Sequence, residues 1–257
     1  MNILQALILG IVEGVTEFLP ISSTAHLMFA STALGLAQSD FVKSFEIAIQ
    51  LGAILAVIAL YWRALLDWRL LSKIVTAFIP TAVIGLALYT LVKTYLIGNV
   101  LLALWVLGLG GLVLIAFEWW HGKQATADHE TVTEISYKQA AIIGVTQSLA
   151  IVPGVSRSAA TIVGGLLMGI NRETIVQFSF LLAVPTMAAA TGLDLLKSYQ
   201  DFTSADVTVL AIGFVASFVV ALVAIKWFLG FVRKHTFTSF GIYRVVAAVA
   251  FFFLIFK

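Results

Sequence analysis

The amino-acid sequence predicts an all-α, polytopic membrane protein: an inverted-topology repeat with six spanning helices and two re-entrant broken helix pairs. Three observations lead to this fold class. The chain is 61% hydrophobic and only 11% charged, whereas soluble domains carry roughly 25% charged residues. Long apolar runs recur along its length, and two of them are interrupted at matching positions. We therefore expect a single membrane domain over residues 1–257, with no soluble domain appended.

Six uninterrupted apolar runs are each long enough to cross a bilayer, because about 20 helical residues span the hydrocarbon core. We expect each of them to form one spanning helix. The six runs are residues 44–62, 72–92, 97–119, 174–193, 206–228 and 239–256.

Two further apolar regions are broken in the middle. In residues 3–36 a helix is expected to end at Pro20, and in residues 139–170 another is expected to end at Pro153 and Gly154. Each half is too short to cross the membrane, so each region is predicted to enter and leave on one side. Broken backbone at membrane depth is tolerated only where it is buried in protein or lines a cavity.

The two broken regions match each other in sequence, which predicts an internal duplication. Repeat 1 spans about 1–120, a polar linker about 121–137, and repeat 2 about 138–257. Three spans follow each broken pair. Because this number is odd, the second copy starts from the opposite side of the membrane and is inverted relative to the first. Interrupted helices at equivalent positions of an inverted repeat indicate a binding site near the midplane. The matches are Gln5, Ala6 and Gly10 with Gln139, Ala140 and Gly144, Glu13 with Gln147, Pro20 with Pro153 after a slip of one residue, and Leu34, Gly35 and Leu36 with Met168, Gly169 and Ile170.

Lysine and arginine in the connecting segments predict the orientation, because cytoplasmic loops carry an excess of basic residues. Eight lie on one side and four on the other, so we place the first set in the cytoplasm and both termini outside. The linker then lies in the cytoplasm, and we expect no chemistry from it. The cytoplasmic set is Arg63, Arg69, Lys73, Lys123, Lys138, Arg172, Arg233 and Lys234, and the other set is Lys43, Lys93, Lys197 and Lys257.

Composition also excludes several classes of function. The net charge is only +2 and the basic residues are scattered singly, so no nucleic-acid partner is expected. The absence of cysteine removes disulfides and thiolate chemistry. The first residues lack a basic segment and a cleavage site, so we read them as mature sequence. No glycine-rich nucleotide loop is present, which argues against ATP-driven transport.

The first broken region concentrates polar groups in apolar sequence, reading GIVEGVTEFLPISSTAHL over residues 10–27. Polar groups at bilayer depth normally face a cavity and are functional. Glu13 and Glu17 lie one helical turn apart, and such a carboxylate pair either shifts a pKa upward or binds a cation. Alternatively, they lie at a frayed helix end. Three hydroxyl residues and a candidate base follow the proline: Ser22, Ser23, Thr24 and His26.

The second broken region supplies a cation. Its sequence PGVSRSAAT places Arg157 at the start of a half-helix, together with the hydroxyl residues Ser156, Ser158 and Thr161. Arginine has a planar fork of donors that matches phosphate oxygens, and a helix N-terminus also favours anions. The alternative is that Arg157 only neutralises Glu13 or Glu17.

Four other polar residues at membrane depth are weaker signals. Glu46 and Gln50 lie one turn apart in the first full span and either support the site or form helix-packing hydrogen bonds. Asp194 and Lys197 are read as interface residues.

The two motifs EGVTEFLPISSTAH and PGVSRSAAT closely resemble those of the bacterial undecaprenyl pyrophosphate phosphatases, the family also known for bacitracin resistance. The resemblance covers essentially the whole chain, including FEIAIQLGAILAV and FSFLLAVPTMAAATGLDLLKS. It implies an enzyme of the bacterial cytoplasmic membrane that hydrolyses a C55 isoprenyl pyrophosphate to the monophosphate and phosphate, recycling the lipid carrier for cell-wall synthesis.

The resemblance also implies a divalent cation, Mg²⁺ or Ca²⁺, as cofactor, and roles for individual residues. Ala159 is a departure, since relatives often have glycine there, but it removes no reacting group. The implied matches are Glu13 and Glu17 with the acidic motif, Ser23 and His26 with the nucleophile and base region, and Ser156, Arg157, Ser158 and Thr161 with the phosphate-binding motif.

The residues leave several alternatives open. In one alternative, Ser23 attacks the terminal phosphorus while His26 or Glu17 takes its proton. In the other, a metal-bound water attacks the phosphorus directly. A transporter or flippase of an anionic lipid or solute is the alternative function, because inverted repeats with broken helices are typical of transporters. The isoprenyl tail is expected to lie among membrane lipids in apolar grooves between spans. The sequence leaves open whether the chain forms a homodimer.

Overall fold

The computed structural model describes residues 1–37, 39–96, 98–122, 131–198 and 206–255, and these residues form helices and connecting segments without strands. Short turns of other helical types occur at Val92–Leu96 (η1), Val132–Glu134 (η2) and Ser148–Ile151 (η3). The α-helices are α1 (Ile3–Thr16), α2 (Ser23–Ala33), α3 (Asp40–Leu65), α4 (Trp68–Leu91), α5 (Val100–His121), α6 (Tyr137–Gln147), α7 (Arg157–Leu167), α8 (Arg172–Ser198), α9 (Asp206–Val232) and α10 (Thr238–Ile255).

The six long helices α3, α4, α5, α8, α9 and α10 each contain an apolar stretch long enough to cross a membrane. They coincide with the six expected spans, so the chain is an all-α, multi-pass membrane protein. Their outer faces carry large exposed apolar side chains, such as Trp105 on α5 and Val223 on α9. In water such a surface would be a liability, whereas hydrocarbon chains of lipid cover it favourably.

Both interrupted regions fold as a helix, a break and a second helix: α1 with α2, and α6 with α7. The same two features occur in each. The residue before the second helix, Ser22 or Ser156, has a positive φ of 70° or 72°. A glutamine in the first helix donates to a carbonyl at the end of the second, Gln5 to Leu34 at 3.2 Å and Gln139 to Met168 at 3.3 Å. These features follow the predicted duplication, while the inverted arrangement across a membrane stays a prediction.

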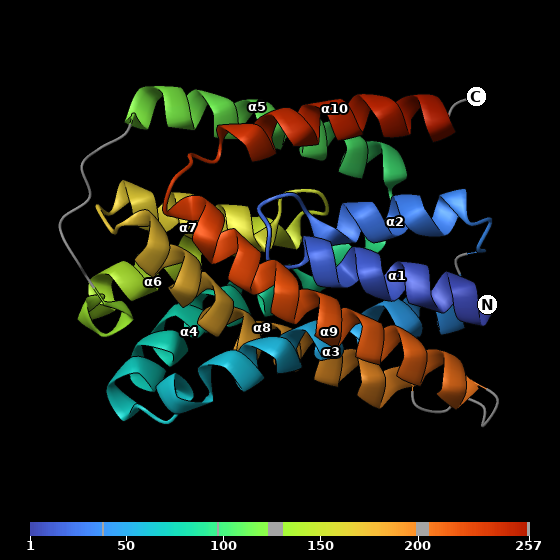
Figure 1. Cartoon of the computed structure of the whole chain (residues 1–257), viewed down its shortest axis with the longest axis horizontal. Coiled ribbons are helices and arrows are strands. Elements are labelled where there is room, and N and C mark those ends of the chain that lie inside the picture. The colour runs from blue at the N-terminus through green and yellow to red at the C-terminus, as the bar shows by residue number, and fades with distance from the viewer. Residues whose placement is uncertain (38, 97, 123–130, 199–205, 256–257) are drawn as a thin grey trace.

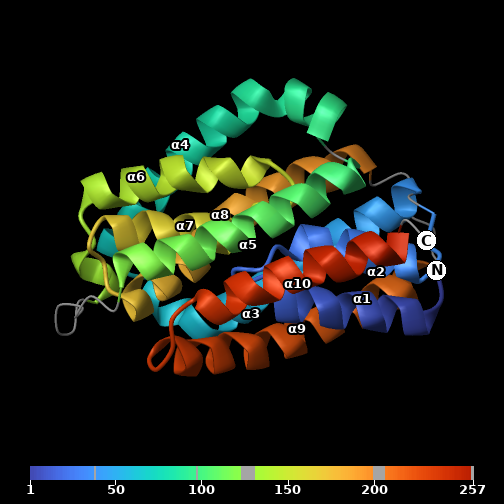
Figure 2. The same ribbon diagram turned by 90° about the horizontal axis from the view of Figure 1, so that it is seen from above.

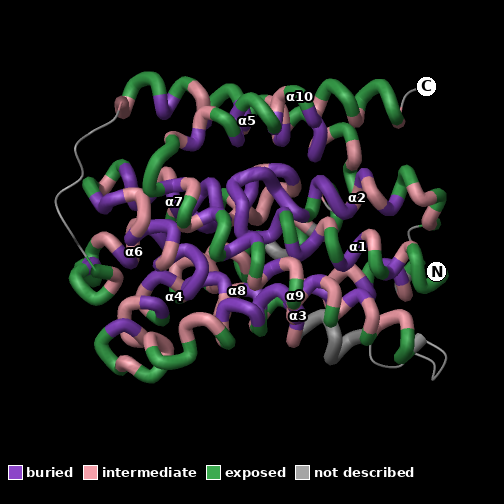
Figure 3. Tube along the Cα trace, in the orientation of Figure 1, coloured by how far each residue is buried: buried purple, intermediate pink, exposed green. Residues whose placement is uncertain are grey.

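Each broken pair packs against a span from the other half of the chain. Helix α1 lies along α9 and α6 lies along α4, while α5 and α10 run side by side as a separate layer (Figures 1 and 2). Glycine makes the two close approaches, because a Cβ at Gly10 or Gly144 would meet a backbone oxygen of α9 or α4 at 2.4 or 2.0 Å. Both breaks lie in the middle of the molecule (Figure 3); the first is buried, whereas the second is only partly buried.

The ends of the helices that carry most of the basic residues gather at one end of the molecule. The last turns of α3, α5 and α9 and the first turns of α4, α6, α8 and α10 lie there (Figure 1). Two ion pairs tie this end together, Arg172 with Glu118 and Arg233 with Glu173. The placement of this end on the cytoplasmic side stays a prediction. The middle of the predicted linker, residues 123–130, lies outside the described residues.

Replacing Gly10 with alanine is expected to destabilise the fold by about 1–3 kcal/mol, because the added methyl group overpacks the contact with the backbone of α9. Gly230→Ala is the matched control, since a Cβ at Gly230 meets open space. That change is expected to be neutral or to stabilise α9 by up to about 1 kcal/mol. Thermal unfolding of both variants in one detergent measures the difference. A Gly10→Ala variant as stable as Gly230→Ala would contradict the close packing.

Candidate active site

The two breaks meet at a cavity of about 230 Å³ in the middle of the molecule. Residues from both breaks line it together with residues of α3 and α8, so neither half of the chain forms it alone. Its walls contain an acid, an arginine, several hydroxyl groups and an amide, surrounded by apolar atoms. The lining residues are Glu17, Ser22, Ser23, Thr24, Gln50, Ala150, Val152, Pro153, Gly154, Ser156, Arg157, Met187 and Ala190.

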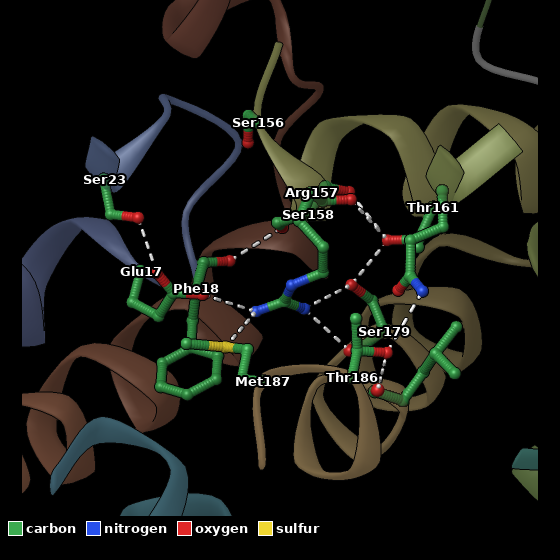
Figure 4. Close-up of polar contacts among 12 residues, drawn as sticks. Glu17, Phe18, Ser23, Ser156, Arg157, Ser158, Thr161, Ser179, Thr186 and Met187 are labelled. Atoms are coloured by element: carbon green, nitrogen blue, oxygen red, sulfur yellow. Dashed lines mark hydrogen bonds and ion pairs between the residues drawn. The ribbon is translucent and has the colours of Figure 1, made fainter. Parts of the chain in front are cut away.

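A chain of polar contacts crosses the cavity from one break to the other (Figure 4). Ser23 Oγ donates to Glu17 Oε2 at 2.5 Å. Arg157 Nη2 donates to the other oxygen of the same carboxylate, Oε1, at 3.0 Å. Glu17 therefore contacts a hydroxyl group that follows its own break and a cation from the other one. All three side chains line the cavity.

Arg157 is held in place by α8 but keeps unused hydrogen-bonding capacity. Its Nη1 donates to the backbone oxygen of Ser179 at 2.8 Å and to Ser179 Oγ at 3.3 Å. The guanidinium also lies over the ring of Phe18, 5.7 Å from its centroid. Its Nε is buried and has no hydrogen-bond partner among the described residues. A fixed cation that lines a cavity is suited to an anionic ligand.

The two serines that precede α2 and α7 are backbone outliers. Ser22 and Ser156 both have positive φ, which is uncommon for residues other than glycine. Such a conformation costs of order 1–3 kcal/mol and clusters at ligand-binding sites. Ser156 Oγ accepts a hydrogen bond from the amide of Ala159, as a capping serine does. The side chain of Ser22 makes no capping bond, so Ser22 is not the ordinary N-cap that its position suggests.

Glu13 is fully buried, and both of its carboxylate oxygens lack a hydrogen-bond partner in the part of the chain that the structure describes. The amide of Glu17 donates to the carbonyl of Glu13 at 2.9 Å, so Glu17 caps the last turn of α1, to which Glu13 belongs. A buried carboxylate without a partner is costly. A cation or a proton would relieve this cost.

The described residues contain no group of three or more histidine, cysteine or acidic side chains placed to hold a metal ion. Glu13 and Glu17 are nevertheless oxygen donors of the kind that Mg²⁺ and Ca²⁺ prefer. Mg²⁺ in particular is commonly bound by one or two carboxylates, with waters and substrate phosphates completing its coordination. The donor set therefore fits such a cation.

His26 is engaged away from Ser23. Its Nδ1 contacts the backbone oxygen of Ser22 at 2.8 Å, and its Nε2 contacts the hydroxyl of Tyr243 at 2.8 Å. Its ring also stacks on that of Tyr243, with centroids 5.6 Å apart. Of the two candidate bases, Glu17 is therefore the one in contact with the Ser23 hydroxyl.

Ser158 and Thr161 are buried beside the cavity but are not among its lining residues. Ser158 Oγ donates to the backbone oxygen of Phe18 at 2.8 Å, which joins α7 to the first break. Thr161 Oγ1 lies 2.6 Å from Ser179 Oγ, the hydroxyl that also contacts Arg157. In this structure both residues hold the site together, whereas Ser156 and Arg157 face the cavity.

The structure adds residues that the motifs did not indicate. Nothing in the sequence marks Ser179 as functional, because it is a single hydroxyl residue within a predicted span. Arg244 has a clear signal, an arginine in the middle of an apolar run, which sequence reasoning overlooked. Of the weaker candidates, Gln50 lines the cavity, and Glu46 accepts a hydrogen bond of 2.5 Å from Ser31. The side chains of residues 194 and 197 lie outside the described part of the structure.

Comparison with known proteins matches residues 6–250 to the family described as bacitracin resistance protein BacA. The chain belongs to this family. It is 50% identical to an undecaprenyl-diphosphatase of Aquifex aeolicus over 97% of this chain and 98% of the relative. A Sulfurihydrogenibium protein of the same name is 49% identical over 98% and 99%. One from Campylobacter jejuni is 46% identical over 99% and 95%.

Proposed function

We propose that this BacA-family protein is an integral membrane phosphatase that hydrolyses undecaprenyl diphosphate to undecaprenyl phosphate and inorganic phosphate. Relatives that match nearly the whole chain carry the name undecaprenyl-diphosphatase. The main observation that supports placing this reaction in the cavity is the series of contacts from Ser23 through Glu17 to Arg157. The physiological consequence is recycling of the lipid carrier for cell-wall synthesis, with resistance to bacitracin.

In the proposed reaction, Ser23 Oγ attacks the terminal phosphorus while its proton passes to Glu17, the carboxylate that it contacts. The new Oγ–P bond forms as the bond from phosphorus to the bridging oxygen breaks, and undecaprenyl phosphate leaves. Water then attacks the phosphorus of the phosphoserine as the Oγ–P bond breaks, the proton held by Glu17 passes back to Ser23 Oγ, and inorganic phosphate leaves with the oxygen of the water. Trapping of a phosphoserine at residue 23 during turnover would support this order of steps.

Arg157 and the N-termini of α2 and α7 are proposed to hold the diphosphate. Phosphoryl transfer depends mainly on positioning and on stabilising negative charge. The start of each half-helix presents backbone N–H groups and a partial positive charge, which favour phosphate. At rest Arg157 pairs with Glu17, so a bound phosphate would compete for the guanidinium and free the carboxylate to accept a proton.

Glu13 and Glu17 are the residues that would hold a divalent cation. When bound, the cation would offset the negative charge of the two acids and of the substrate phosphates. This proposal is supported by the buried Glu13 carboxylate, whose oxygens have no hydrogen-bond partner among the described residues.

A chelator is expected to abolish phosphate release from the wild-type protein, and added Mg²⁺ or Ca²⁺ is expected to restore it. Glu13→Gln should raise the cation concentration needed for half-maximal activity by about tenfold, because removal of one charged ligand weakens binding by an energy of order 1.4 kcal/mol. Titration of activity with each cation measures the shift. Direct cation binding by calorimetry gives a second readout, and unchanged binding in Glu13→Gln would refute the assignment.

The proposed location is the bacterial cytoplasmic membrane with both termini outside the cytoplasm. The gathering of basic helix ends at one end of the molecule supports this orientation. The lipid tail would leave the cavity between helices, among membrane lipids. Accessibility labelling of single cysteines introduced at the exposed residues 2 and 234 would test the orientation in a chain without native cysteine.

The direct test is phosphate release by the purified protein from undecaprenyl diphosphate in the presence of a divalent cation. Appearance of one phosphate and one undecaprenyl phosphate per substrate is the expected result. No release under these conditions would overturn the proposal. The relatives' names give no support to the transporter or flippase alternative, which predicts that labelled lipid crosses a liposome membrane without hydrolysis.

A further inference from the structure

Arg244, in the middle of α10, is the most deeply buried cation near the breaks, with 1% of its surface exposed. No carboxylate pairs with it in the described part of the chain. Its three nitrogens contact only backbone carbonyls. Nε donates to Leu107 at 3.1 Å. Nη1 donates to Val155 at 3.1 Å and to Pro20 at 3.4 Å, and Nη2 donates to Gly154 at 2.8 Å and to Val106 at 3.4 Å.

These carbonyls belong to both breaks. Pro20 lies two residues before Ser22, while Gly154 and Val155 directly precede Ser156. One guanidinium therefore holds the backbone immediately before both of the strained serines. The remaining two carbonyls are on α5, the partner of α10 in the layer above the breaks (Figure 1).

The surroundings leave space for this side chain. A Cβ at Gly110 on α5 would meet Arg244 Nη2 at 2.1 Å, so glycine lets the guanidinium pass. A buried charge without a counter-ion costs several kcal/mol. Breaks at membrane depth leave carbonyl groups without helical partners. Arginine offers five donors in a rigid fork and so satisfies several carbonyls at once.

We infer that Arg244 is a positioning residue for phosphate hydrolysis, which fixes the two breaks against each other so that Ser23 and Arg157 face one cavity. This inference rests on the proposed function. Arg244 lies outside the cavity lining and acts through the carbonyls of Pro20 and Gly154. A small displacement of either half-helix would misalign the hydroxyl and the phosphate-holding cation, and misplacement by about 1 Å can cost about 100-fold in rate.

The kinetic test compares Arg244→Met and Arg244→Lys with Arg233→Met, which removes an exposed arginine whose hydrogen bonds go to Glu173 and not to the breaks. We expect Arg244→Met to lower kcat by about 100-fold and to change KM by less than about threefold, because Arg157 still holds the substrate. Arg244→Lys should recover part of kcat, since an ammonium group has three donors instead of five. Retention of wild-type kcat in folded Arg244→Met, or a change in KM alone, would overturn the inference.

A distance measurement tests the same inference without activity. Nitroxide labels on Thr24→Cys and Leu149→Cys report the separation of the two breaks in a chain without native cysteine. The distribution of distances should broaden in Arg244→Met and stay narrow in Arg233→Met.

If the wild-type protein releases no phosphate, the proposed function fails while this measurement still decides the structural role. If Arg244→Met does not fold, Gly110→Ala carries the test, because its methyl group displaces the guanidinium. Unchanged distances and unchanged kcat in Gly110→Ala would then refute the role.

Discussion

Arg157→Met is expected to lower kcat/KM for undecaprenyl diphosphate by at least about 10³-fold. An arginine that stabilises the charge of a transferring phosphoryl group contributes about 10³–10⁵ to the rate. Arg157 is the only arginine among the residues that line the cavity. Steady-state phosphate release measures the loss, and Arg157→Lys is expected to recover only part of it because lysine lacks the bidentate fork.

The same substitution should also destabilise the protein, which allows the two effects to be separated. Removing Arg157 leaves Glu17 buried without its cation, and breaking one side of a buried pair costs about 3–5 kcal/mol. Replacing both partners, as Glu17→Gln with Arg157→Met, should restore most of the stability but none of the activity. Recovery of activity in this double variant would refute the proposed catalytic roles of both Arg157 and Glu17. Arg233→Met is the control for loss of an exposed arginine.

The spans and breaks could be predicted from the sequence because the bilayer imposes strong constraints on the chain. Each of the six apolar runs had to become a helix, since lipid offers no partner to backbone N–H and C=O groups. Pro20 and Gly154 lie in the segments where the helices stop, as predicted. Proline alone was not sufficient to predict a break, because Pro80 and Pro185 lie inside α4 and α8. Helix ends differ from the predicted ones by a few residues, as at α3, which begins at Asp40 instead of residue 44.

The candidate site was only partly predictable. The sequence indicated which residue types face a cavity, because charge at membrane depth requires one. It raised a pairing of Arg157 with Glu13 or Glu17 as an alternative without choosing the acid, and the structure shows the contact with Glu17, 140 positions away. The structure places Ser158 and Thr161 in supporting contacts, and it places His26 against Tyr243. Such choices depend on the packing of distant helices, which no local pattern encodes.

The two broken regions contribute different chemistry to one site. The first supplies the acids and the candidate nucleophile, and the second supplies the cation. Gln147 illustrates the divergence: it occupies the position that matches Glu13 and donates to Thr81 and Thr186 at 2.9 and 3.1 Å. An acid at both positions would have placed two charges with no neutralising partner at depth. The two broken regions thus share the backbone features of the predicted duplication, while their ionisable groups differ.

Ser23→Ala and Glu17→Gln are each expected to lower kcat by about 10³–10⁴-fold, and the double variant by no more than either alone. Ser23 Oγ donates to Glu17 Oε2 at 2.5 Å, so the proposed nucleophile and base act as one unit. Residues that act as a unit in catalysis show such strongly non-additive losses. Single-turnover phosphate release, with detection of phosphoserine at residue 23, measures both the rate and the intermediate.

His26→Gln provides the comparison that separates the two candidate bases. Because the ring nitrogens of His26 contact the Ser22 carbonyl and Tyr243, we expect this variant to lose about tenfold in kcat and still form phosphoserine. A loss as large as that of Glu17→Gln would make His26 the base, after a rearrangement on substrate binding. Full activity in Ser23→Ala would exclude the serine nucleophile and leave direct attack by water. Glu17 would then remain the base that activates the attacking group, because its carboxylate still faces the cavity.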